Sequence, residues 1–217
     1  MRAVLYLGRR CDAAYAATML TDLLPLASYC LVMSGTPGPN TVLLAASGAQ
    51  FGYRRTLPHG LGISAGVAAQ TFLCAFGLGT LFTAFPIVQQ GLRWVGAAYL
   101  VWLAWRLATN PVGARGEAGG RPMSFWEGAA FQAVNPKTWL KAITIGSVFL
   151  PAHLAPLPAA TLVTAIGFGV GYPCITAWTL FGVGLRRWLQ QPRQRRRFNA
   201  IMGGALVVLA LRMLLSP

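Results

Sequence analysis

The chain has 217 residues, of which 55% are apolar and only 10% are charged. Soluble domains usually carry about 25% charged residues, so this composition favours a protein that lies in a lipid bilayer. The formal charge is +14, from 18 Lys and Arg against 4 Asp and Glu. Because the basic residues lie in short clusters between long apolar stretches, a nucleic-acid-binding protein is not expected.

Residues 1–18 precede the first apolar segment. We expect translation to begin at Met19, which opens a stretch that reads as a natural start, and we expect residues 1–18 to be a dispensable extension. A cleaved signal peptide is the alternative, since Arg9 and Arg10 precede an apolar run. It is less favoured because Asp22 interrupts that run and no clear small-residue cleavage site follows.

Six apolar segments are long enough to cross a hydrocarbon core, which takes about 20 residues. We therefore expect an all-α integral membrane protein with six transmembrane helices in a single domain, residues 19–217. The predicted spans are 23–51, 57–84, 87–109, 126–150, 157–184 and 198–215.

The first span is interrupted near its middle by the sequence SGTPGPN, residues 34–40. Pro37 and Pro39 each lack a backbone N–H group, and each crowds the carbonyl group four residues earlier. The fourth span contains a second interruption, Asn135-Pro136-Lys137. A lone proline can merely kink a packed span. Here each of the two interruptions has an asparagine next to its proline, and this matched pair favours two true helix breaks.

The connection 110–124 divides the chain into a first half, 19–109, and a second half, 125–217. Each half has three predicted spans, and an odd number of crossings inverts the second half relative to the first. We therefore expect an inverted 3+3 repeat with broken first and fourth spans. Interrupted helices at corresponding positions of inverted halves indicate the substrate site of a transporter that works by alternating access.

The chemistry of the breaks suggests what they bind. The half-helix that begins near Asn40 would point free N–H groups and a positive dipole end at a cavity, which suits a substrate carboxylate. Asn135 is a suitable N-cap for a second half-helix with proline at its first position. The predicted substrate-binding residues are Pro37, Gly38, Pro39, Asn40, Gln70, Asn135, Pro136, Lys137 and Lys141.

Lys137 and Lys141 are the only lysines in the chain, and their spacing of four residues puts them on one helix face. Ionisable groups at membrane depth are costly and usually functional. For Lys137 the alternative is a side chain that extends to the cytoplasmic membrane surface. For the deeper Lys141, the alternative is a packed polar partner.

The arginines predict the orientation of the spans. They flank the first, third and fifth connections, whereas the second and fourth, residues 85–90 and 151–158, contain no Lys or Arg. The positive-inside rule puts the basic connections in the cytoplasm and both termini in the periplasm. Six arginines within residues 186–197 are also expected to attract anionic lipid. The arginines concerned are Arg54, Arg55, Arg106, Arg115, Arg121, Arg186, Arg187, Arg193, Arg195, Arg196 and Arg197.

Catalytic or metal chemistry is not indicated. The four cysteines form no CxxC pair, and His59 and His153 are predicted near opposite membrane surfaces. The sequence contains no HExxH or GxSxG motif either. We therefore expect no metal, no cofactor and no enzyme, and an integral-membrane enzyme is the less favoured alternative. Gly62 and Gly66 form a small-residue face for close helix packing, and exposed small-residue faces would permit a homodimer.

Several stretches together resemble the lysine-exporter (LysE/RhtB) translocator superfamily, over nearly the whole chain from Met19 onward. They are TPGPN at 36–40, the glycine ladder 60–66, GAAYLVWLAWRL at 96–107 and FWEGAAFQAVNPK at 125–137. The last two look closest to the cysteine and O-acetylserine exporter branch. The resemblance implies a secondary carrier of the bacterial inner membrane that exports small amino acids and is driven by protons.

The chain departs from that family pattern at two positions. Some members have an acidic residue where this chain has Asn40, and many have one shortly after the glycine ladder, where this chain continues to Gln70. A dicationic substrate such as lysine would need a buried carboxylate, so we expect a small neutral amino acid. Threonine, homoserine or a homoserine lactone, carried by the same fold, are the alternative substrates.

Overall fold

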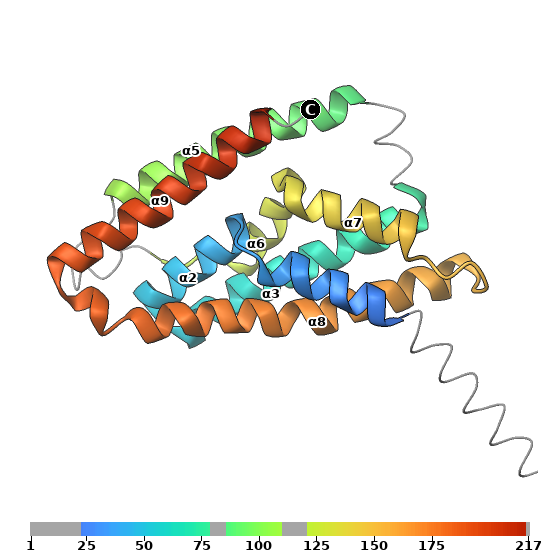
Figure 1. Cartoon of the computed structure of the whole chain (residues 1–217), viewed down its shortest axis with the longest axis horizontal. Coiled ribbons are helices and arrows are strands. Elements are labelled where there is room, and N and C mark those ends of the chain that lie inside the picture. The colour runs from blue at the N-terminus through green and yellow to red at the C-terminus, as the bar shows by residue number, and fades with distance from the viewer. Residues whose placement is uncertain (1–22, 79–85, 110–120, 216–217) are drawn as a thin grey trace, which may run out of the picture.

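This computed structural model describes residues 23–78, 86–109 and 121–215. Within these ranges the regular structure is entirely helical, as the apolar segments predicted (Figure 1). The expected extension 1–18, the start at Met19 and residues 110–120 of the connection lie outside the described ranges.

The helices follow one another in the same order in both halves. The first half comprises the helix Leu23–Gly35, α2 (Pro39–Phe51), α3 (Tyr53–Leu73) with a π-helical turn η1 (Cys74–Leu78), and α5 (Pro86–Thr109). The second half comprises α6 (Phe125–Phe131), a 3-10 turn η2 (Gln132–Val134), α7 (Pro136–Val148), α8 (Pro156–Leu185), a 3-10 turn η3 (Trp188–Gln190) and α9 (Pro192–Leu215).

Two of the described helices are long and apolar enough to cross a membrane, namely Tyr53–Gly77 and Pro156–Leu185. Shorter apolar helices cover Leu23–Gly35 and Trp94–Trp105.

Two helices begin several residues earlier than predicted. The second span was expected from residue 57, but α3 begins at Tyr53, because Gly52 turns the chain within one residue by adopting a φ of 82°. The sixth was expected from residue 198, but α9 begins at Pro192, since proline is well tolerated at a helix start. The arginines that follow Pro192 therefore lie in the first turns of α9 and not in a loop.

Helices α5 and α9 lie side by side along one side of the molecule (Figure 1). Their shared core also takes in side chains from α2 and α6, so this pair is attached to the rest of the bundle. The buried residues of this core include Ala97, Leu100, Leu103, Leu206, Ala210, Val42 and Phe131.

Helix α3 crosses α6 too closely for side chains at the crossing. A Cβ atom at Gly62 would overlap the carbonyl group of Phe125, and one at Gly66 would lie 2.7 Å from the carbonyl oxygen of Ala129. The predicted small-residue face of Gly62 and Gly66 is thus confirmed as a packing face.

A glycine also fixes each segment that follows a helix break. On α2, a Cβ atom at Gly48 would overlap the carbonyl group of Thr179 in α8. On α7, a Cβ atom at Gly146 would lie 2.9 Å from the backbone of Cys74, at the end of α3. Each segment therefore packs closely on the long helix of the opposite half.

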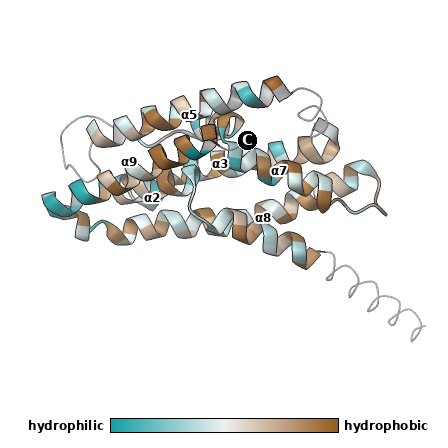
Figure 2. Ribbon diagram, turned by 45° about the horizontal axis from the view of Figure 1, so that its top comes forward, coloured by the Kyte–Doolittle hydropathy of each residue, from teal (hydrophilic) through white to brown (hydrophobic). Residues whose placement is uncertain are grey.

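The basic stretches gather at one end of the molecule. A Cβ atom at Gly52 would lie 3.7 Å from a guanidinium nitrogen of Arg186, so the start of α3 lies beside the end of α8. Buried Ala49 of α2 packs in one cluster with Phe198, in the second turn of α9. Figure 2 shows the hydrophilic stretch that marks the start of α9 at this end.

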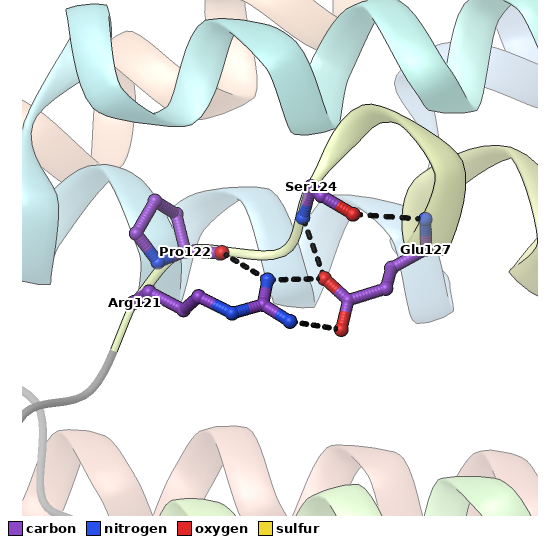
Figure 3. Close-up of polar contacts among 4 residues, drawn as sticks. All are labelled: Arg121, Pro122, Ser124 and Glu127. Atoms are coloured by element: carbon purple, nitrogen blue, oxygen red, sulfur yellow. Dashed lines mark hydrogen bonds and ion pairs between the residues drawn. The ribbon is translucent and has the colours of Figure 1, made fainter.

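The start of α6 is fixed by side chains of its first turn (Figure 3). Glu127 accepts a hydrogen bond from the N–H of Ser124 at 2.7 Å, and Ser124 Oγ accepts one from the N–H of Glu127 at 3.2 Å, which makes a capping box. Arg121 donates to both carboxylate oxygens of Glu127, at 2.5 and 2.8 Å. The Glu127 carboxylate is therefore bonded to the start of α6 and to Arg121.

Candidate functional site

The first helix is interrupted where the sequence predicted. Residues 36–38 are not helical, and α2 begins with Pro39 as its first residue. The N–H of Gly38 donates to Thr41 Oγ1 at 2.8 Å, and the Thr41 hydroxyl donates to the carbonyl oxygen of Gly38 at 2.9 Å. Thr41 thus supplies a partner for the N–H of Gly38 and a second donor for its carbonyl oxygen, which also accepts from the N–H of Val42.

The second interruption lies between α6 and α7. Asn135 adopts an extended conformation, with φ −89° and ψ 106°, and Pro136 is the first residue of α7. The Asn135 side-chain oxygen accepts a hydrogen bond from the N–H of Lys137 at 3.2 Å. The predicted N-cap role of Asn135 is thereby confirmed.

Gln132 connects the polar residues of both breaks. Its side-chain amide forms two reciprocal hydrogen bonds with that of Asn40, at 2.9 and 3.2 Å, and accepts a third from Asn135 at 3.3 Å. Gln70 donates to the carbonyl oxygen of Gln132 at 2.6 Å. Three predicted site residues thus meet on a fourth that the sequence analysis missed. The available signal was a glutamine in an apolar span, three residues before Asn135.

Lys137 reaches across to the first break. Its ammonium donates to the carbonyl oxygen and to Oγ1 of Thr36, both at 2.8 Å, and to the carbonyl oxygen of Pro37 at 3.2 Å. The carbonyl end of a helix carries partial negative charge, so a cation is well matched there. The ammonium therefore bonds the backbone of the first break.

Lys141 lies one turn further along α7 and is only 5% exposed. Its ammonium donates to Ser34 Oγ at 3.0 Å, so it has the kind of polar partner that the alternative interpretation required. Ser34 belongs to the last turn of the helix that precedes the first break. Both lysines therefore join α7 to the first half.

A cavity of about 60 Å³ lies between the two breaks. A single water needs roughly 10–15 Å³ measured in the same way, so the cavity suits a few waters or a small solute. Six of the predicted residues line it: Gly38, Pro39, Asn40, Asn135, Lys137 and Lys141.

The other three predicted residues do not line the cavity. Gln70 acts through its hydrogen bond to Gln132, Pro136 begins α7, and Pro37 offers its carbonyl oxygen to Lys137. We therefore assign these residues to the frame of the site.

Two hydroxyl groups that the sequence analysis missed also line the cavity. Ser64 belongs to α3 and Thr164 to α8, and neither hydroxyl oxygen has a hydrogen-bond partner among the described residues. Buried polar atoms are nearly always hydrogen-bonded. These two hydroxyls are therefore positions where a ligand can bond.

The cavity lining is positively charged. Lys137 and Lys141 both contribute to it, whereas the one carboxylate in the described ranges, Glu127, is paired with Arg121 at the start of α6. No described acidic residue lines the cavity. A bound solute would therefore meet cations, amides and hydroxyls, which suits an anionic group next to a neutral polar one.

Comparison with known proteins finds one matching family and clear relatives. The LysE type translocator family matches residues 31–216. The cysteine/O-acetylserine efflux protein of Escherichia coli (strain K12) is 33% identical over 185 residues, which cover 85% of this chain and 93% of the relative. The protein of that name from Shigella flexneri has the same identity and coverage. No solved structure matches the chain.

Proposed function

The chain belongs to the LysE type translocator family, and from this premise we propose that it exports small neutral amino acids or their derivatives across the bacterial inner membrane. Cysteine and O-acetylserine are the first candidate substrates, because two similar relatives bear those substrates in their names. Threonine, homoserine or a homoserine lactone are the alternatives within the same fold. A family of translocators favours transport over the membrane-enzyme alternative.

The observation that carries this proposal is the cavity between the two helix breaks. It is lined from both halves of the chain, by Asn40 on one side and by Asn135 and Lys141 on the other. In secondary carriers, the substrate binds where broken helices of the two halves meet near the middle of the membrane. The small volume of the cavity agrees with a small amino acid.

We propose that the six predicted spans form an inverted 3+3 repeat. Support comes from the common order of elements, which is a broken helix, a long helix and an outer helix in each half. Further support comes from Gly48 and Gly146, which pack the segments after the two breaks onto the long helix of the opposite half. Alternating access would then be a rocking of one half against the other around the cavity.

The end of the molecule that gathers the arginines is proposed to face the cytoplasm, which puts both termini in the periplasm. The arginines at the start of α3, at the end of α8 and at the start of α9 would lie at the surface of the inner leaflet, where anionic lipids attract them. Protons are the proposed coupling ion, as the resemblance to the family implies.

The neutral-substrate proposal rests on the charge of the lining. A dicationic amino acid would bring its side-chain ammonium next to Lys137 or Lys141, with no described carboxylate to offset it. A neutral polar side chain instead finds amide and hydroxyl groups.

The test is transport by the purified protein in liposomes. The vesicles are loaded with labelled cysteine, O-acetylserine, threonine, homoserine or lysine, and efflux is followed with and without a pH gradient, against protein-free vesicles. We expect selective, gradient-dependent efflux of one or more neutral amino acids. Efflux of lysine alone would contradict the neutral-substrate proposal, and efflux unaffected by the pH gradient would contradict proton coupling.

A further inference from the structure

The two lysines of α7 differ in how many of their hydrogen-bond donors are used. An ammonium group has three donors, and Lys137 uses all three on the carbonyl oxygens of Thr36 and Pro37 and on Thr36 Oγ1. Lys141 has one hydrogen bond among the described residues, to Ser34 Oγ, so two of its donors remain for a ligand. Of the two, only Lys141 is both deeply buried and able to form new bonds.

The position of Lys141 in the cavity follows from α8. A Cβ atom at Gly171 would lie 3.7 Å from the Lys141 ammonium nitrogen and 3.5 Å from Ser34 Oγ. The missing side chain at Gly171 leaves the ammonium open to the cavity, which both residues line.

Ser64 of α3 lies at the same level as Gly171. A Cβ atom at Gly60 would touch Ile175 at 3.2 Å, and Ala75 packs in one buried cluster with Ala160. Helices α3 and α8 therefore run antiparallel, with Gly60 opposite Ile175. Ser64 lies four residues after Gly60, and Gly171 lies four residues before Ile175, so these two residues are at the same level. Gly171 contacts the Lys141 ammonium, which is therefore at this level too.

An ammonium at this depth is costly unless an anion accompanies it. No described carboxylate lines the cavity, and the Ser64 hydroxyl, which also lines it, has no partner among the described residues. A single ligand group that carries a negative charge and accepts several hydrogen bonds would neutralise the Lys141 ammonium and give the Ser64 hydroxyl a partner.

We propose that Lys141 and Ser64 together bind the carboxylate of the transported amino acid. Two N–H donors of Lys141 and the O–H of Ser64 bond the carboxylate oxygens, while Lys137 serves the backbone of the first break and does not touch the substrate. Thr164 lies seven residues before Gly171 on α8, about 10 Å along the helix axis, so it belongs to the other end of the cavity. This assignment rests on the proposed export function and names the part of the substrate that the site recognises.

The experiment compares an amino acid with its carboxamide, which keeps the ammonium and the side chain but has no negative charge. Efflux of labelled cysteine from reduced proteoliposomes is measured with unlabelled cysteine or cysteinamide as competitor. If the panel above identifies another substrate, that amino acid and its carboxamide replace the pair. The variants are Lys141→Met, Ser64→Ala and Lys137→Met, the last a matched loss of charge from the same helix face.

In the wild type, we expect the amino acid to compete about 10- to 100-fold more strongly than the carboxamide, as a charged hydrogen-bonded group should. Lys141→Met should remove this preference, Ser64→Ala should reduce it, and Lys137→Met should slow efflux but keep the preference. Lys141→Arg, which keeps the charge, should restore part of it.

Three results separate the possible failures. Absence of any amino-acid efflux by the wild type would contradict the proposed function itself. Efflux that the acid and the carboxamide inhibit equally would overturn carboxylate recognition, with no need for a variant to fold. A preference that is lost in Lys137→Met and kept in Lys141→Met would overturn the assignment to Lys141.

Discussion

The two helix breaks lead into half-helices of the same kind, yet they are held together differently. Each half-helix begins with proline, Pro39 in α2 and Pro136 in α7. Around the first break, two side chains from the other half bond the carbonyl groups: Lys137 bonds those of Thr36 and Pro37, and the indole N–H of Trp178 bonds that of Gly35 at 3.3 Å. The second break is instead held by a network of amide groups centred on Gln132.

This difference determines how many hydrogen bonds must be broken before each helix break can move. Release of the first requires the withdrawal of the Lys137 ammonium and the Trp178 N–H, and the residues whose carbonyl groups they leave, Gly35, Thr36 and Pro37, are exposed enough for water to replace these donors. Release of the second would leave several buried amides without partners, which is costly. We therefore expect the first break to be the movable one and the second to be the rigid part of the site.

The largest effect is expected where the segment after the first break is anchored. Gly48→Ala adds a Cβ atom that overlaps the carbonyl group of Thr179, so α2 and α8 must separate. We expect a loss of about 3 kcal/mol in the free energy of unfolding. Thermal unfolding in detergent measures this loss. Gly184→Ala is the matched control, because a Cβ atom there meets nothing within 4 Å. Equal stability of the two variants would contradict the close crossing.

A change at the centre of the second break tests its rigidity. Gln132→Leu keeps a side chain of similar size but leaves the amides of Asn40 and Asn135 without their shared partner. The expected loss is about 2 kcal/mol of unfolding free energy, measured by the same thermal unfolding. Gln90→Leu, on the exposed surface of α5, should leave the unfolding temperature nearly unchanged. If both variants unfold like the wild type, the amide network does not hold the break.

The smallest stability effect is expected at the first break. Lys137→Met removes three hydrogen bonds, but water can reach the carbonyl groups that remain, so the loss should be about 1 kcal/mol. Efflux should fall much more than this small change in stability suggests, because the first break is no longer closed. Efflux rates at matched protein amounts, beside the unfolding temperature, provide the measurement, and Lys137→Arg should recover part of the rate. Normal efflux by Lys137→Met would contradict a movable first break.

Local chemistry made part of this arrangement predictable. Proline cannot donate a backbone hydrogen bond, so the two breaks could be located from the sequence, and so could the N-cap at Asn135. Glycine spacing likewise identified the packing face of Gly62 and Gly66.

The remainder depends on contacts between distant parts of the chain. Gln132 is notable only because Asn40, 92 residues away in the sequence, lies opposite it. Ser64 was missed because a hydroxyl in a helix usually bonds to its own backbone, and only the fold shows that this one does not. The different roles of Lys137 and Lys141 were equally inaccessible, since the two share a helix face and differ in the backbone that each one meets.

The hydrogen bonds from Lys137 to Thr36 span 101 residues of sequence, which has a consequence for synthesis. At about 5–20 residues per second, Lys137 follows Thr36 out of the ribosome by roughly 5–20 s. Throughout that interval, the carbonyl groups of Thr36 and Pro37 in the nascent first half lack the Lys137 ammonium that bonds them in the finished fold. Water or the insertion machinery must solvate them, so the first half completes its fold only after the second has entered the membrane.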